Sequence, residues 1–161
     1  MTTWLVLALL SADPPRCPTE LFRIERSKNA NVVLYEVQAS PSGELQPDAP
    51  VVASWLMLAD RGQREALTFF ERRAAYGFDV ERLKDGVALS LKALARRPIQ
   101  VRRHGACHAA LSAIDGHDAV LQRIFVTSDE RPLIPEVLSI ELFGVDAVTG
   151  AALHETITAA R

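Results

Sequence analysis

Hydrophobic and polar residues alternate along most of the chain, in short runs that are separated by turn-forming residues. In residues 21–26, Phe22 and Ile24 fall on one side and polar residues on the other, the pattern of a strand with one buried face. The run from 51 to 58 is apolar on both sides, which predicts a central strand that is covered on both faces.

Turn signals divide these runs and indicate how they connect. Asp85-Gly86 and Asp115-Gly116 each separate two β-like runs, and both residue types accept the positive φ of a type I′ hairpin turn. Counting the runs gives roughly ten short strands joined by short turns, which predicts a mainly β fold, an antiparallel sandwich or barrel.

One segment, about residues 61–76, has helical spacing instead. Asp60 and Gln63 fit a capping box at its start, and Gly77 is free to take the positive φ that ends a helix. Apolar residues recur along it at intervals of three and four, at Ala66, Leu67, Phe70 and Ala74. We therefore expect a single helix, covering an open end or an edge of the sheet.

The N-terminal residues differ from the rest. An unbroken apolar run from 4 to 10 is followed by small residues and then by prolines, an order typical of a secretory signal. A buried N-terminal strand is the alternative. We predict a signal peptide over 1–12, a linker over 13–20 and one β-rich domain over 21–161, exported to the periplasm or the outside of the cell. The run is too short to span a bilayer, so no transmembrane span is expected in the mature chain.

Composition limits the classes of function. The chain has 161 residues, 48% of them hydrophobic and 24% charged, with a formal net charge of −2. Nothing in that balance would attract nucleic acid, so we expect no nucleic-acid partner. The sequence carries no nucleophile elbow, phosphate-binding loop or zinc-protease motif, so it predicts no catalytic residue and no cofactor, and an enzyme is the less favoured class.

The two cysteines, Cys17 and Cys107, could form one disulfide in an oxidising compartment, and two unrelated free thiols are the alternative. His104 and His108 flank Cys107, which gathers three groups that bind metals. A zinc site needs three or four converging ligands, and a hairpin with surface histidines explains the same spacing. We therefore predict no metal site.

Four short motifs occur in a distinctive order. Arg26-Ser27-x-Asn29-x-Asn31 precedes a strand, Trp55 lies in a later strand, and Ala75-Tyr76-Gly77 and Leu142–Asp146 follow. In this order they resemble an uncharacterised family of bacterial exported domains of unknown function, which carries an Arg-Ser-x-Asn-x-Asn signature near its start. The resemblance covers about residues 21–158. It implies a bacterial exported domain, and it implies neither an activity nor a catalytic residue.

Arg26 is in phase with the apolar residues of its strand, so its side chain should point inward. A buried guanidinium needs acceptors for its fixed fork of donors. Asn29 and Asn31 could offer amide oxygens, and Glu71 a carboxylate. One interpretation is a structural network that pins the turn after the strand.

The other interpretation is a ligand-binding pocket in which Arg26 anchors an anion and Trp55 or Tyr76 forms an aromatic wall. The tentative ligand-binding residues are thus Arg26, Asn29, Asn31, Trp55 and Tyr76. The leading hypothesis for the whole chain is a non-enzymatic exported domain that binds an envelope component or a small ligand. The alternatives are a small-molecule-binding barrel, its ligand enclosed by Trp55, Tyr35 and Phe125, and an enzyme of unknown reaction.

Overall fold

The computed structural model describes residues 17–73, 75–129, 131 and 136–158, so the predicted signal peptide lies outside the described residues. The described chain is mainly β, as the alternating pattern predicted. Its strands are β1 (Glu20–Arg26), β2 (Asn29–Val37), β3 (Val51–Met57), β4 (Gln63–Ala66), β5 (Phe78–Leu83), β6 (Gly86–Leu91), β7 (Ile99–His104), β8 (Cys107–Ile114), β9 (His117–Asp129), β10 (Glu136–Asp146) and β11 (Ala152–Thr158). The helical elements are α1 (Phe69–Arg73) and two short 3₁₀ turns, η1 (Leu58–Asp60) and η2 (Lys92–Leu94).

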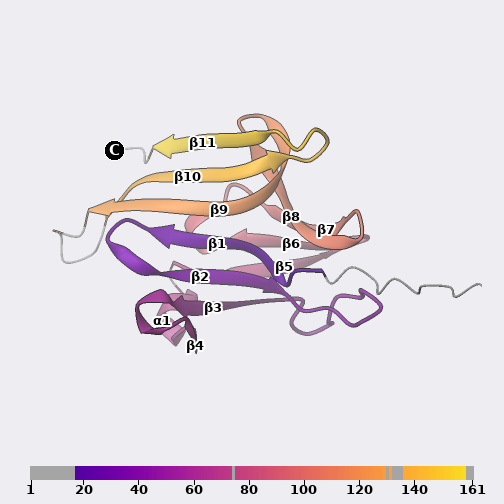
Figure 1. Cartoon of the computed structure of the whole chain (residues 1–161), viewed down its shortest axis with the longest axis horizontal. Coiled ribbons are helices and arrows are strands. Elements are labelled where there is room, and N and C mark those ends of the chain that lie inside the picture. The colour runs from indigo at the N-terminus through magenta and orange to yellow at the C-terminus, as the bar shows by residue number, and fades with distance from the viewer. Residues whose placement is uncertain (1–16, 74, 130, 132–135, 159–161) are drawn as a thin grey trace, which may run out of the picture.

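All of these strands belong to one sheet, which branches at β9. One edge of β9 pairs along its length with β10, which continues to β11. The other edge pairs first with β8, around Val120, and then with β1, around Ile124. Two arms therefore leave β9 on the same edge, β1-β2-β3-β4 and β8-β7-β6-β5, and Figure 1 shows the second passing behind the first.

The pairing of β1 with β9 is parallel, whereas the other ladders of the sheet are antiparallel. The sheet is therefore mixed and curled, and within the mainly β fold that the sequence predicted, a sandwich or barrel, this one ladder departs from the antiparallel pairing. The physical reason is that β1 reaches β9 after a long crossover through the other strands, and only such a crossover can bring two strands together in parallel.

The hydrophobic core fills the space between the two arms. Phe22 on β1 stacks on Tyr35 of β2 at 4.4 Å between ring centroids, and Tyr35 meets Phe78 of β5 at 5.7 Å. The Tyr35 hydroxyl donates to the Tyr76 carbonyl at 2.8 Å, which satisfies the one polar atom that this ring brings into the core. The opposite arm contributes fully buried aliphatic side chains, among them Val87, Leu89, Leu91, Ile99 and Val101.

The long helix expected over 61–76 is wrong in its first half. Arg61 and Gly62, with φ of 61° and 76°, turn the chain back after η1, and the next residues pair with β3 as the edge strand β4. The helix begins only after Thr68, which forms a capping box with Glu71: each residue's side chain accepts from the other's backbone N–H. Asp60 ends η1 and Gln63 begins β4, so this pair caps no α-helix.

The expected hairpins form, one of them shifted by a residue. Asp115 and Gly116 take φ of 51° and 77° between β8 and β9, the two positive values that a type I′ turn requires. Between β5 and β6 the strands are joined by Lys84 and Asp85, because Gly86 is already the first residue of β6.

Cys17 and Cys107 form a disulfide, with 5.4 Å between their Cα atoms. The bond joins the residues that lead into β1 to the start of β8, and so ties one arm of the sheet to the other. Of the two alternatives that the sequence left open, the structure contains the bridge.

Candidate functional site

The inner face of the first arm changes from apolar to polar at one end. Along β2, alternate residues share a face, so Asn29 and Asn31 lie on the same side as the buried Val33. Across the ladders Val33 pairs with Trp55 of β3, and Trp55 pairs with Glu65 of β4. Beyond the end of the core, these strands therefore carry polar side chains on the face that elsewhere packs inward.

A hollow of about 250 Å³ opens at this end, and we call it the Trp55 pocket. Its walls come from β2, β3, β4 and the segment that enters α1. The lining residues are Asn29, Asn31, Trp55, Met57, Glu65, Ala66, Thr68 and Glu71. Only Glu65 and Glu71 among them are charged, so the lining is acidic.

Glu71 holds α1 against the aromatic wall of the Trp55 pocket. One of its carboxylate oxygens accepts from Trp55 Nε1 at 3.1 Å, and the other accepts from the Thr68 backbone N–H at 2.7 Å. Both oxygens therefore have a protein donor. Burial alone would raise the pKa of Glu71, but the hydrogen bonds with Thr68 and Trp55 together hold that pKa below its usual value.

A second layer of residues supports Trp55 from behind. Tyr76 is buried and meets the Trp55 ring edge-on, with 5.2 Å between the ring centroids. Arg26 Nη1 donates to the Tyr76 hydroxyl at 3.2 Å. Burial raises the pKa of Tyr76, as does the nearby Glu71 charge, while Arg26 opposes both. The phenol is therefore neutral at ordinary pH and acts here as a hydrogen-bonding group.

The five residues proposed from the sequence thus gather at one end of the fold, in two layers. Asn29, Asn31 and Trp55 line the pocket, whereas Tyr76 and Arg26 lie behind it. The inward direction expected for Arg26 fits its contact with the buried Tyr76 hydroxyl, although Arg26 itself is half-buried rather than mostly buried.

The two asparagines hydrogen-bond to backbone groups in this structure. Asn29 Oδ1 accepts from the Asn31 backbone N–H and so braces the turn before it. Asn31 Oδ1 accepts from the Ala59 backbone N–H and so ties β2 to the η1 turn. Arg26 is not a lining residue, and the charges of the lining are carboxylates. The lining therefore does not fit an anion-binding pocket anchored by Arg26.

Sequence reasoning missed Glu65, Thr68 and Met57 as lining residues. Glu65 and Thr68 fall in the segment read as one long helix, where their faces could not be assigned to the sheet. The Thr68-x-x-Glu71 capping box was the signal that could have moved the helix start and freed residues 63–66 for a strand.

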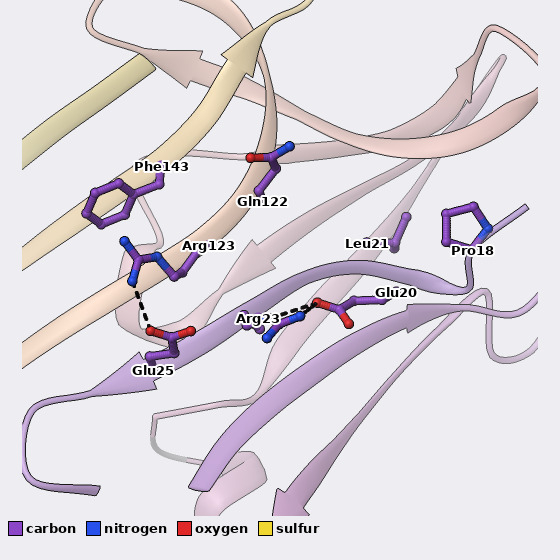
Figure 2. A pocket seen from close by; sticks show the side chains of 8 residues that line it. All are labelled: Pro18, Glu20, Leu21, Arg23, Glu25, Gln122, Arg123 and Phe143. Carbon is purple, nitrogen blue, oxygen red and sulfur yellow. Dashed lines mark hydrogen bonds and ion pairs between the residues drawn. The ribbon is translucent and has the colours of Figure 1, made fainter. Parts of the chain in front are cut away.

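A second hollow, of about 580 Å³, lies on the outer face of β1, β9 and β10 and is shown in Figure 2. Arg123 lies over the Phe143 ring, 3.8 Å from its centroid, and donates to Glu25 at 3.1 Å. Arg23 donates to Glu20 at 2.8 Å. The charged groups of this hollow already pair with one another. It therefore has fewer charged groups available to contact a ligand than the Trp55 pocket has.

The strand register separates the three aromatic residues proposed to enclose a ligand in a barrel. Phe125 pairs with Glu25 on β1, whereas Ile24, one residue earlier, pairs with Val33 and through it with Trp55. Phe125 and Trp55 therefore point to opposite faces, and Tyr35 is a fully buried core residue. These three side chains do not enclose a common cavity.

The histidine and cysteine cluster does not converge. Cys107 is bonded to Cys17. Among the residues that the structure describes, no group of three or more His, Cys, Asp or Glu side chains could hold a metal ion. Within the same residues, no helix has the length and apolarity to cross a membrane.

The fold and the site define a mainly β domain with an acidic pocket, walled by a tryptophan, at one end of its core. The chain belongs to the family described as a domain of unknown function (DUF4833), whose model matches residues 22–156. No curated protein and no solved structure matches the chain significantly.

Proposed function

We propose that this chain is a non-enzymatic, exported domain that binds a saccharide of the cell envelope in the Trp55 pocket. The observation that carries the proposal is the chemistry of the lining: one indole ring beside amides and carboxylates, in an open hollow of about 250 Å³. The apolar face of a sugar ring packs on an aromatic ring, and planar amide and carboxylate groups bond its hydroxyls.

The polar groups of the pocket differ in how many hydrogen bonds they already make within the protein. Glu71 is engaged at both oxygens, so it orients Trp55. Glu65 is exposed, and no other described residue bonds to its side chain. The amide nitrogens of Asn29 and Asn31 are donors that the braced turns do not use. We therefore assign Glu65 and the two amides to direct contact with the sugar.

The acidic lining also favours one charge class of sugar. A carboxylate attracts an ammonium group and repels another carboxylate, most strongly at low salt. The preferred ligand is accordingly an amino sugar or a neutral sugar, and an acidic sugar is disfavoured.

Glu71 does not suit the role of a general acid in this pocket. A general acid at neutral pH needs a carboxyl group whose pKa is raised toward 7. The hydrogen bonds from Thr68 and Trp55 lower the pKa of Glu71 instead, which keeps this carboxylate ionised.

Export is supported by the disulfide between Cys17 and Cys107, because such bonds persist mainly in oxidising compartments. If the chain is exported through the predicted signal, the mature protein should lack about its first 12 residues. Intact-mass measurement of the secreted fraction tests this, and full-length protein recovered only from the cytosol would contradict it.

Calorimetric titration tests the ligand class with three probes: chitosan oligomers, which carry ammonium groups, neutral N-acetylated chito-oligosaccharides, and oligogalacturonates. We expect the affinity to fall in that order. Glu65→Gln should weaken binding of the chitosan oligomers about fivefold, the effect of one partly exposed ion pair. Glu81→Gln, on the exposed strand β5, is the matched control and should bind like the wild type.

The proposal fails if none of the three probes binds at millimolar concentration, or if oligogalacturonate binds most tightly. Equal affinities of the wild type and Glu65→Gln for chitosan oligomers would remove Glu65 from the site.

A further inference from the structure

Two phenylalanines of α1 point into solvent. Phe69 and Phe70 are 64% and 79% exposed, and their rings meet each other edge-on with 5.8 Å between centroids. The other four phenylalanines of the chain are buried or half-buried. A contiguous exposed aromatic pair, unlike a single exposed leucine, marks an interaction surface.

The fold does not need phenylalanine at these two positions. The capping box that starts α1 uses the neighbouring Thr68 and Glu71, and α1 has no buried residue among those described. Polar residues would serve the first turn of this helix equally well. Since no described residue covers the two rings, they are best explained by a contact beyond the part of the chain that the structure describes.

Basic side chains flank one ring of this aromatic pair, that of Phe69. Phe69 lines an open hollow together with Arg72, Arg73 and Lys92, and the Arg73 guanidinium lies 6.0 Å from the Phe69 ring centroid. Lys92 is paired with Asp79. Within the described residues, neither arginine has a carboxylate partner.

The nearest acidic group on α1 does not cancel these charges at the surface. Glu71 turns away from Phe69 and Phe70, toward Trp55 and Thr68 on the pocket side of the helix. One side of α1 thus forms a wall of the Trp55 pocket, and the other presents two aromatic rings and two unpaired guanidinium groups. Figure 1 shows α1 at the outer margin of the molecule, beside β3 and β4, where a broad surface could approach it.

We infer that this side of α1, the Phe69–Phe70 surface, docks on an anionic lipid surface. Aromatic rings with flanking basic groups settle at the boundary between headgroups and acyl chains, and each basic residue near an anionic leaflet adds to the attraction. The two arginines provide the charge complementarity that selects an anionic surface over a neutral one. The inference does not depend on what occupies the Trp55 pocket.

The test is flotation of the full chain with unilamellar vesicles of phosphatidylglycerol and phosphatidylcholine (1:1), and with phosphatidylcholine alone. At low salt the wild type should partition about tenfold more strongly onto the anionic vesicles, and high salt should remove this preference. Arg72→Gln with Arg73→Gln should lower binding to the anionic vesicles about tenfold. Phe69→Ser with Phe70→Ser should lower binding to both vesicle types.

Two controls keep the test specific. Val148→Ser alters a side chain that is 92% exposed in a distant turn, and it should bind like the wild type. The apolar run at 4–10 could itself bind lipid in unprocessed protein, so the readout must also be local. In the Phe70→Trp variant, brominated lipid should quench tryptophan fluorescence more strongly than it does in the wild type. Thermal melts should show that every variant is folded.

Either of two results would overturn the inference. One is equal partitioning of the wild type and the Phe69→Ser, Phe70→Ser variant onto anionic vesicles. The other is a wild type that binds no anionic vesicle. Dimers of that wild type in sedimentation velocity, absent for the double serine variant, would then show that the aromatic pair contacts a second copy of the chain.

Discussion

The disulfide offers the clearest quantitative prediction, because it links two residues that are far apart in the sequence. Cys17 and Cys107 are separated by 90 residues, and the bond closes this loop in the unfolded chain as well as in the folded one. In the chain-entropy description, closing a loop of this size stabilises the folded state by about 4–5 kcal/mol. Replacing both cysteines by serine should therefore remove most of that stabilisation.

The measurements are urea unfolding and thermal unfolding, each followed by circular dichroism, for the wild type and for Cys17→Ser with Cys107→Ser. For a domain of this size, the expected loss corresponds to a fall in melting temperature of about 10–15 °C. Dithiothreitol supplies a matched control: it should lower the stability of the wild type to that of the variant and leave the variant unchanged. Equal midpoints for the oxidised wild type and the variant would refute the loop-closure reasoning.

Two further predictions concern α1. Thr68→Ala removes the hydroxyl that accepts from the Glu71 backbone N–H, and should cost about 1 kcal/mol in urea unfolding, while Thr68→Ser should keep most of that stability. Because the folded-state pKa of Glu71 is lowered, its contribution to stability should be complete above its unfolded pKa of about 4.3 and lost as pH falls through the folded value. Glu71→Gln should flatten the acid side of the stability–pH curve measured by thermal melts, and an unchanged slope would contradict the assignment.

The strands could be predicted because their pattern is local. A period of two places Phe22 and Ile24 inward from the sequence alone, and the structure buries both. Asp115-Gly116 fixes its hairpin because the turn chemistry needs only adjacent residues.

The helix was misplaced because β4 carries no alternation to read. Every residue from Gln63 to Ala66 is exposed, and Arg, Glu and Ala favour helices when nothing else decides. Only pairing with β3 makes this segment a strand, and that pairing is a tertiary contact. With this segment predicted as a helix, Glu65 and Thr68 could not be placed in the pocket.

The branch at β9 could not be predicted for a different reason. Parallel pairing of β1 with β9 joins Ile24 to Ile124, and no local pattern encodes a partner at that distance. The candidate site could be predicted only in part from the sequence, for the same reason. Its residues come from strands whose neighbours are set by this topology.

Sharing β9 between the two arms also constrains the order in which the domain can fold. Ile24 and Ile124 are 100 positions apart, so β1 keeps an unsatisfied edge until β9 has been made. Contacts of such long sequence separation slow folding, because the cost of closing the loop is met before the contact forms. In a chain synthesised from its N-terminus, β1 can pair with β2 at once, but its pairing with β9 must wait for the next hundred residues. Truncation before β9 would leave an incomplete sheet, rather than a smaller domain.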